Sequence, residues 1–283
     1  MINDACCRIF RYGLIGALAL AGETGLTQNF APVAENVTFE QVQTLPYREP
    51  DATVTYGDKE LQYGTLWVPD TNANVPLVIL IHGGCWLNSC EVNHSRPLAT
   101  ALNNSGFAVW SLEYRRTGDP GGGWPSTLED IQLALSQLEL LSSYPIVLSR
   151  VAVAGHSAGG HLALMAGADL TPLKAVIGLA PIVDMETYSK GTNSCQTAGP
   201  AFIGVSLDDG PELYAFANPV KQALNPASML LHGVNDEIVP LDHFPQDLLP
   251  LSIVAGTGHF DWIHPGTPAY HLFLSTLKFR LAQ

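Results

Sequence analysis

Ser157 is the residue of this chain with the strongest claim to be a catalytic nucleophile. It lies in the pentapeptide Gly-His-Ser-Ala-Gly at 155–159, between the apolar run 151–154 and the apolar stretch 160–166. A buried strand that turns sharply into a helix at a G-x-S-x-G sequence is typical of a nucleophile elbow. Glycines on both sides let strand and helix approach closely while the serine takes a strained conformation. The pentapeptide alone is a weak signal, so its partners matter.

Two further segments place an acid and a base after Ser157 in the chain. The short buried run 229–231 opens into a loop that carries Asp236 just past the end of a predicted strand, where a carboxylate could orient a histidine. The apolar run 251–255 is followed by Gly-Thr-Gly-His-Phe, which puts His259 at a loop tip. The order along the chain is therefore serine, acid, histidine.

A third segment has the form of an oxyanion loop. The apolar run 78–81, a predicted central strand, leads directly into His-Gly-Gly-Cys-Trp at 82–86. With the elbow, the acid motif at 232–240 and the Gly-His pair at 258–259, this loop makes the chain resemble the α/β-hydrolase family. Within that family it is similar to the H-G-G esterase branch, which includes hormone-sensitive-lipase-like carboxylesterases and kynurenine formamidases. The resemblance covers roughly residues 60–280.

The resemblance implies a role for each matching residue. Ser157 corresponds to the nucleophile, His259 to the general base and acid, and Asp236 to the residue that orients it. The implied oxyanion hole consists of the backbone N–H groups of Gly84, Cys85 and Ala158.

Cys85 departs from the H-G-G-G form of the loop. Formamidase-like members of the branch accept a larger residue there, which favours that side slightly. A bulkier side chain at 85 is expected to narrow the acyl side of the cleft while leaving the backbone donor in place, so short acyl groups should be preferred. Trp86 and Trp124 are predicted to line the pocket because each adjoins a glycine-rich loop.

The resulting functional prediction is a serine hydrolase that cleaves small carboxylic esters through an acyl-enzyme. The first alternative is an arylformamidase of the kynurenine formamidase type, acting on N-formyl aryl amides. A peptidase similar to the prolyl oligopeptidase branch is less favoured because no propeller domain is present. A non-catalytic, ligand-binding homologue is also less favoured, because all three triad positions are filled.

Composition restricts the partners. The chain has 283 residues, of which 47% are hydrophobic and 14% charged, as expected for one well-packed domain. A formal net charge of −13 argues against nucleic acids and anionic membrane surfaces and favours a neutral or cationic small-molecule substrate, an ester or amide. No cofactor or metal is expected: the loop 118–123 lacks the Lys-Ser/Thr pair of a P-loop, and the histidines lack zinc-type spacing. The oligomeric state is left open.

The N-terminus has the pattern of a secretory signal peptide. Arg8 and Arg11 precede the apolar residues 12–20, and Ala-Leu-Ala at 19–21 has the small-x-small form of a cleavage site. The apolar stretch is too short to span a bilayer, so no stable membrane insertion is expected. A secreted or periplasmic location follows; Asp4 keeps open a cytoplasmic enzyme with an N-terminal extension. The predicted division is a signal peptide at 1–21, an extension at 22–50 and one α/β-hydrolase domain at 51–283.

The cysteines allow one bridge and do not define a framework. Cleavage would remove Cys6 and Cys7 and leave Cys85, Cys90 and Cys195, an odd set. Cys90 and Cys195 could pair in an oxidising compartment, but their separation in space does not follow from the sequence.

Strands alternate with helices along the chain, which predicts an α/β fold: a mostly parallel central sheet with an antiparallel N-terminal hairpin and helices on both faces. The interval 184–226 is too long for a simple connection and is expected to be a substrate-facing insertion. Arg115 and Asp130 are expected to pair beneath the active-site loops, by analogy with the Y-R…D pattern of the esterase branch. The expected elements are a hairpin at 53–56 and 61–68, strands at 107–112 and 175–179, and helices at 97–104, from 125 to Leu138, and at 268–281.

Overall fold

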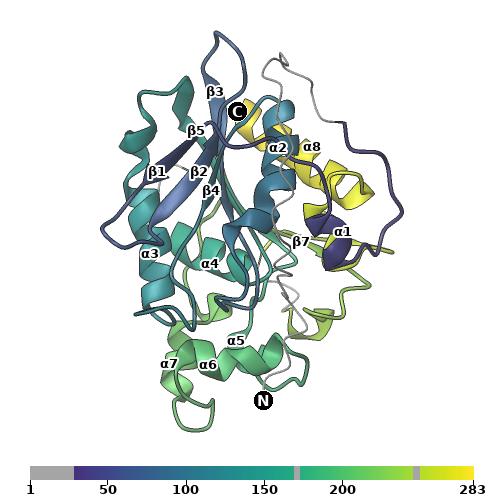
Figure 1. Cartoon of the computed structure of the whole chain (residues 1–283). Coiled ribbons are helices and arrows are strands. Elements are labelled where there is room, and N and C mark those ends of the chain that lie inside the picture. Colours follow the sequence, from purple (N-terminus) through teal and green to yellow (C-terminus); the bar gives the residue numbers. More distant parts are fainter. Residues whose placement is uncertain (1–28, 169–172, 245–248) are drawn as a thin grey trace, which may run out of the picture.

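The structure, a computed structural model, describes residues 29–168, 173–244 and 249–283. The predicted signal peptide lies outside the described residues. An eight-stranded sheet with the order β1-β2-β4-β3-β5-β6-β7-β8 forms its centre (Figure 1). The β1-β2 and β2-β4 pairs are antiparallel and the remaining pairs are parallel, as the sequence predicts. The strands are β1 (Ala52–Thr55), β2 (Tyr63–Trp67), β3 (Val75–Ile81), β4 (Ala108–Leu112), β5 (Ile146–His156), β6 (Ala175–Leu179), β7 (Ser228–Gly233) and β8 (Leu251–Val254).

Helices cover both faces of the sheet. Side chains alternate along each strand, so both faces carry apolar side chains that must be buried. In β3, Leu77 and Ile79 point into one hydrophobic core, and Val78 and Leu80 point into the other. The first core is closed by α3 (Ser126–Ser136) and α4 (Ala158–Gly167), and the second by α2 (Arg96–Asn104) and α8 (Pro268–Ala282). The central strands are buried on both sides, which explains their continuous apolar runs.

One predicted helix is shorter than expected. α3 ends at Ser136, and Leu138 begins a separate 3₁₀ turn, Leu138–Leu141. The backbone leaves the α-helical region at Gln137, whose N–H turns to the carbonyl of Ala134. Leu138 still packs against the same core, so the apolar spacing is kept although the α-helix does not continue.

Residues 29–50 pack against the rest of the fold. They include α1 (Phe39–Gln43), which begins at a capping box: the Thr38 hydroxyl accepts from the Gln41 N–H and the Gln41 side chain accepts from the Thr38 N–H. Val37 and Val42 are buried in the core between the sheet and α8. The domain boundary at residue 51 stays a prediction.

Residues 184–226, here called the cap segment, follow β6. They form the short helices α5 (Met185–Tyr188), α6 (Gly199–Ile203) and α7 (Pro211–Phe216), which lie together at one end of the molecule (Figure 1). Three aromatic side chains of this segment, Tyr188, Phe202 and Tyr214, are buried and support packing, whereas Phe216 is 68% exposed. Within the described ranges, no helix is both long and apolar enough to cross a membrane.

Candidate active site

The site lies where the chain changes direction in the sheet. After β3 the chain adds β4 on one side, and then returns to add β5 on the other. Open α/β sheets bind ligands in the crevice outside the carboxyl ends of such strands. The register pairs Ile81 with Gly155, so the loop 82–86 leaves the sheet beside the pentapeptide 155–159.

Ser157 occupies a strained elbow that glycines make possible. Its φ is 57° and its ψ −122°, between the end of β5 and the start of α4. A Cβ on Gly155 would lie 2.0 Å from the Gly159 carbonyl oxygen, and one on Gly159 would lie 2.2 Å from the Ile81 carbonyl oxygen. Neither position can hold a side chain without moving backbone. The Ser157 N–H donates to Leu179 O at 2.9 Å, which fixes the turn to β6.

Asp236 and His259, the acid and the base predicted from the sequence, are in contact. His259 Nδ1 lies 2.7 Å from Asp236 Oδ2, and both side chains are buried. The other carboxylate oxygen accepts from the N–H groups of Ile238 and Val239 at 2.9 and 2.8 Å. Burial alone would raise the pKa of the Asp236 carboxyl, but the charge and hydrogen bond of His259 and the Val239 N–H outweigh it and hold this pKa below its ordinary value. Asp236 therefore stays ionised at neutral pH.

Ser157 and His259 line one pocket, together with the oxyanion loop. Among the residues that the structure describes, no hydrogen bond joins the Ser157 hydroxyl to His259. Catalytic hydrogen bonds are often long before substrate binds, so the shared pocket is the relevant geometry.

His156, the residue before Ser157, contacts the loop that carries His259. Its Nε2 lies 2.9 Å from the backbone oxygen of His259, and the two rings are 4.6 Å apart. Burial and the neighbouring His259 ring hold the pKa of His156 well below its ordinary value. The neutral ring therefore donates its Nε2–H to that carbonyl and holds the loop that carries His259.

The oxyanion loop has three consecutive residues with left-handed backbone conformation. The φ values are 115° at Gly84, 55° at Cys85 and 60° at Trp86, and the last two are uncommon for residues with side chains. A Cβ on Gly83 would lie 3.1 Å from Ser157 Cβ, so loop and elbow touch. In the described part of the chain, no protein acceptor takes the three backbone N–H groups predicted for the oxyanion hole, those of Gly84, Cys85 and Ala158.

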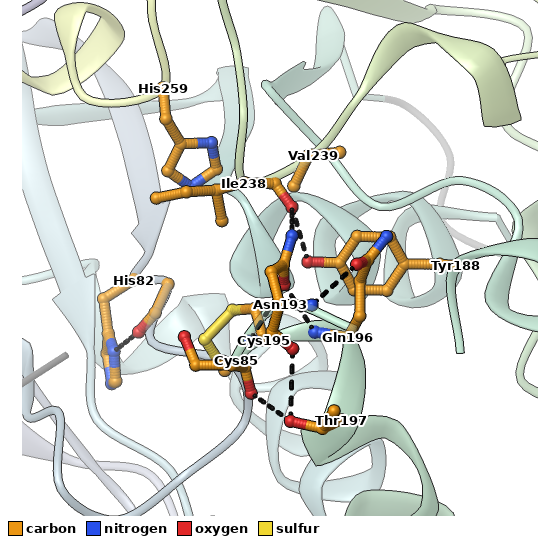
Figure 2. The surroundings of a disulfide bond; sticks show 12 residues. His82, Cys85, Tyr188, Asn193, Cys195, Gln196, Thr197, Ile238, Val239 and His259 are labelled. Carbon is orange, nitrogen blue, oxygen red and sulfur yellow. Dashed lines mark hydrogen bonds between the residues drawn. A yellow bond between two sulfur atoms is a disulfide. The ribbon is translucent and has the colours of Figure 1, made fainter. Parts of the chain in front are cut away.

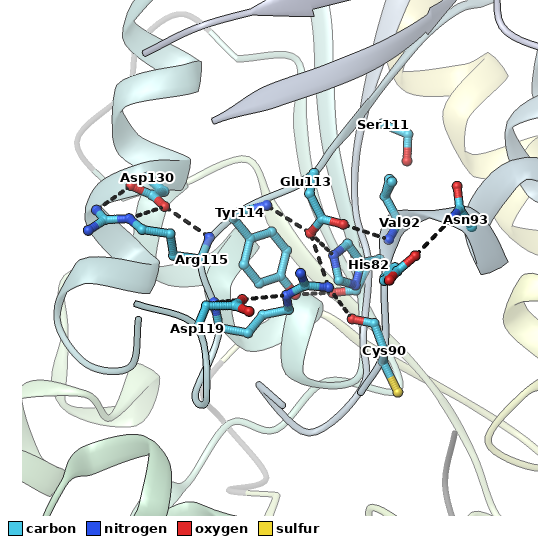
Figure 3. Close-up of polar contacts among 12 residues, drawn as sticks. His82, Cys90, Val92, Asn93, Ser111, Glu113, Tyr114, Arg115, Asp119 and Asp130 are labelled. Atoms are coloured by element: carbon cyan, nitrogen blue, oxygen red, sulfur yellow. Dashed lines mark hydrogen bonds and ion pairs between the residues drawn. The ribbon is translucent and has the colours of Figure 1, made fainter. Parts of the chain in front are cut away.

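A buried carboxylate beneath this loop fixes its first residue (Figure 3). Glu113 lies 3.0 Å from His82 Nε2, accepts from the Val92 N–H at 3.1 Å, and is 3.4 Å from the Arg116 guanidinium. Burial would raise the pKa of Glu113, but His82 and Arg116 outweigh it and lower it. His82 Nδ1 lies 2.8 Å from the Gly83 carbonyl oxygen, so both ring nitrogens of His82 have hydrogen-bond partners.

The expected pair between Arg115 and Asp130 is confirmed. Two guanidinium nitrogens of Arg115 donate to the two carboxylate oxygens at 2.9 and 2.6 Å, and its backbone N–H donates to the same carboxylate at 3.0 Å (Figure 3). Asp130 also accepts from Gln62 at 2.6 Å. These contacts anchor the strand end that carries Glu113 to α3.

Trp86 does not line the pocket around Ser157, contrary to the sequence prediction. Its ring is buried, stacks on Phe202 with centroids 4.7 Å apart, and donates its N–H to His161 Nδ1 at 3.3 Å. Burial lowers the pKa of His161 to about 4, and its Nε2 faces the Ala217 carbonyl at 2.7 Å. Trp124 likewise packs edge-on against Phe202. Both tryptophans join the loops to the cap segment.

Cys195 pairs with Cys85, which overturns the Cys90–Cys195 pairing considered from the sequence. Their Cα atoms are 5.0 Å apart, within the range that a disulfide spans (Figure 2). Cys90 is close to the same loop, since a Cβ on Gly84 would lie 2.3 Å from the Cys90 Cβ. The bridge joins residues 110 positions apart, which no local sequence pattern indicates.

Two contributors to the site were missed in the sequence. Phe39 lines the pocket and lies 5.3 Å from the Phe260 ring; the capping box before it could have revealed the helix that presents it. Asp261 is buried and accepts the N–H groups of Asn36, Val37 and Gly258 at 2.7 to 2.9 Å. It therefore ties the N-terminal segment to the loop that carries His259. Because Asn36 and Val37 are far from Asp261 in sequence, no local pattern could have shown this contact.

No group of three or more metal-ligating side chains occurs within the described residues. A family model described as BD-FAE matches residues 66–246, more than half of the chain. The chain belongs to the BD-FAE family. The crystal structure of esterase B from Lactobacillus rhamnosis is similar to this BD-FAE chain with a TM-score of 0.68 and 21% identity, covering 86% of this chain and 90% of that one. This similarity confirms the α/β-hydrolase fold.

Two curated relatives are similar to parts of this chain. Esterase LipC of Mycobacterium tuberculosis is 26% identical over 67% of this BD-FAE chain and 52% of LipC. The kynurenine formamidase of Salmo salar is 33% identical over 40% of this chain and 36% of that enzyme. The matched part of the chain thus spans about half of the length of LipC and a smaller share of the length of the formamidase.

Proposed function

We propose that this protein is a serine hydrolase that cleaves small carboxylic esters with Ser157, His259 and Asp236. The observation that carries the proposal is the 2.7 Å contact between His259 Nδ1 and Asp236, in a pocket that also contains Ser157 on its strained elbow. A histidine oriented by a buried carboxylate is the general base that a serine hydroxyl needs. The similarity to esterases supports the same activity.

The chemistry proceeds in two balanced halves. His259 takes the proton of Ser157 as the hydroxyl oxygen bonds to the carbonyl carbon, then gives that proton to the departing alcohol. Water attacks the acyl-enzyme by the same route, releasing the acid and restoring the serine. The backbone N–H groups of Gly84, Cys85 and Ala158 stabilise the oxyanion, each by about 3 to 4 kcal/mol. Asp236 stabilises the imidazolium that forms in each half.

We assign the acyl group and the leaving group to two adjoining hollows. The pocket at Ser157 has about 340 Å³, including its open mouth, and is walled by Cys85, Cys195 and Ile238, which suits a short acyl group. A wider cleft of about 1180 Å³, including its opening, begins at His259 and is lined in part by Glu237. Its carboxylates disfavour anionic leaving groups, in keeping with a neutral or cationic substrate. Through Cys195, the cap segment faces the substrate.

The second candidate is an arylformamidase that hydrolyses N-formyl aryl amides. It is favoured by the larger residue at 85 and by the formamidase similarity. A panel of p-nitrophenyl esters from formyl to octanoyl, run beside N-formylkynurenine, decides between the two. The ester proposal predicts the highest kcat/KM on acetyl or formyl esters and a steady fall with chain length. A kcat/KM on N-formylkynurenine above that on every ester would establish the formamidase, and absence of both activities would refute hydrolysis.

We further propose that residues 1–21 form a signal peptide and that the enzyme works outside the cytoplasm. The Cys85–Cys195 disulfide supports this location, because such bonds persist mainly in oxidising compartments.

A further inference from the structure

The Cys85–Cys195 disulfide joins two parts of the site that the sheet does not connect. Cys85 belongs to the oxyanion loop that follows β3, and Cys195 belongs to the cap segment that follows β6. Both cysteines line the pocket that contains Ser157 and His259. The bridge is therefore a wall of the reaction space as well as a cross-link (Figure 2).

The loop end of this bridge needs external support. Cys85 and Trp86 both hold positive φ, and such conformations persist only when surrounding contacts enforce them. Trp86 is fixed by its stack on Phe202 and its bond to His161. The corresponding constraint on the Cys85 side chain is the bond to Cys195.

The cap end of the bridge is anchored to the acid loop. The turn that holds Cys195 begins at Asn193, whose Oδ1 accepts from the Cys195 N–H at 3.1 Å and whose Nδ2 donates to the Ile238 carbonyl at 2.9 Å. The Tyr188 hydroxyl donates to the same carbonyl at 3.0 Å. Ile238 also gives its N–H to Asp236, so the chain of contacts runs from the orienting carboxylate through the cap segment to the oxyanion loop.

We propose that the Cys85–Cys195 disulfide is a positioning and specificity element: it holds the Cys85 N–H in place for the oxyanion and limits the length of the acyl group. The proposal rests on the proposed serine-esterase function. A loop released from the bridge can leave the left-handed conformation, which moves the donor, and a cap turn released from it can move away from Ser157, which lengthens the pocket.

The test is the Cys195→Ala variant, which removes the bridge and keeps residue 85. Rates are divided by the concentration of serines that a fluorophosphonate titrates, so that misfolded protein does not count. We expect kcat on the acetyl ester to fall roughly tenfold with little change in KM, short of the loss of about 10²- to 10³-fold that follows removal of an oxyanion donor. The ratio of octanoyl to acetyl kcat/KM should rise at least about fivefold, within the range that one hydrophobic contact discriminates.

Two comparisons isolate the bridge. Ser194→Ala changes the neighbouring residue in the same turn and keeps the disulfide, so its kcat and chain-length profile should match the wild type. Dithiothreitol should give the wild-type enzyme the profile of Cys195→Ala, because it transfers two electrons to the disulfide, leaving two thiols on the protein and a cyclic disulfide on the reagent. The change that dithiothreitol causes in the wild type should exceed any change in Cys195→Ala, because the reagent also reduces the disulfide of Cys90.

The inference is overturned if Cys195→Ala retains the wild-type kcat and chain-length profile within about twofold, or if only KM changes. If the wild-type enzyme labels at Ser157 and cleaves esters but Cys195→Ala is unchanged, only the role of the bridge is refuted and the esterase proposal stands. Failure of Ser157→Ala to lose labelling would refute the esterase proposal itself.

Discussion

The two carboxylate oxygens of Asp236 point in different directions and have different hydrogen-bond partners. One oxygen receives the Nδ1–H of His259, and the other receives the N–H groups of Ile238 and Val239. The backbone donors fix the carboxylate plane, so the imidazole has one orientation and one tautomer. Because the pKa of Asp236 is held below its ordinary value, this arrangement persists well into the acid range.

Replacement of Asp236 by asparagine should lower kcat by about 10⁴-fold, since the amide can donate to the histidine and favours the wrong tautomer. Steady-state rates on p-nitrophenyl acetate measure the effect. Asp242→Asn, an exposed site a few residues further along, should remain near the wild-type rate. Near-normal activity of Asp236→Asn would remove Asp236 from the mechanism.

Phe39 contributes an aromatic wall that arises far from the other site residues. Its ring packs against Phe260 and against His94, with the second pair 5.5 Å apart. Phe39→Ala should open the pocket and weaken transition-state binding by about 1 kcal/mol or more, seen as a lower kcat/KM on apolar esters. Phe216→Ala removes an exposed ring of the cap segment and serves as the control. Equal kcat/KM values for the two variants would show that Phe39 does not shape the pocket.

Among the elements, the oxyanion loop depends on the buried charges beneath it. Glu113 connects His82, the first residue of the loop, with Arg116 in the segment that follows β4 and with the Val92 N–H. Loss of one member of a buried ionic group leaves the other charges without compensation, which costs about 3 to 5 kcal/mol. The strained loop is thus stabilised by buried ionic contacts as well as by apolar packing.

Glu113→Gln should therefore lower the free energy of unfolding by about 3 kcal/mol or more, measured by urea denaturation. Because the pKa of Glu113 is lower in the folded protein than its ordinary 4.5, its ionised form stabilises the fold above pH 4.5. This contribution is lost as the pH falls through the folded pKa, so wild-type stability should drop on acidification below pH 4.5. The variant should drop less steeply, and parallel curves would contradict the assigned role.

Elements with local signals were predicted well. The strands carrying the site were visible because each is a buried apolar run that ends in a motif, and the Asp236–His259 contact follows from parallel strands ending at one edge. The Cys85–Cys195 bridge and the clamp formed by Asp261 were not predictable, since each joins segments that are distant in sequence. The prediction that Trp86 lines the pocket was wrong. Its place next to a glycine-rich loop does not reveal that the backbone has a positive φ, which changes the direction of the side chain.

For the whole molecule, the net charge of −13 bears on the partners, and the disulfide bears on the compartment. A net charge of this sign disfavours binding to anionic membranes and nucleic acids, and disulfides persist mainly in oxidising compartments. The export that we propose for a signal peptide at 1–21 would provide such a compartment.

We therefore expect protein purified from its native source to begin at or near Gly22, after the Ala-Leu-Ala sequence at 19–21. N-terminal sequencing of the mature protein measures this. An intact Met1 on soluble cytosolic material would contradict export, and Cys85 and Cys195 recovered as free thiols would remove its second support.

We propose Ser157 as the nucleophile of a serine hydrolase, and covalent labelling of this residue can be measured without a known substrate. The wild-type protein is treated with a fluorophosphonate and its intact mass is measured, beside Ser157→Ala and, as a control elsewhere on the chain, Ser206→Ala. We expect one adduct on the wild type and on Ser206→Ala, and none on Ser157→Ala. A Ser157→Ala protein that still takes up the label, or a folded wild type that does not, would contradict it.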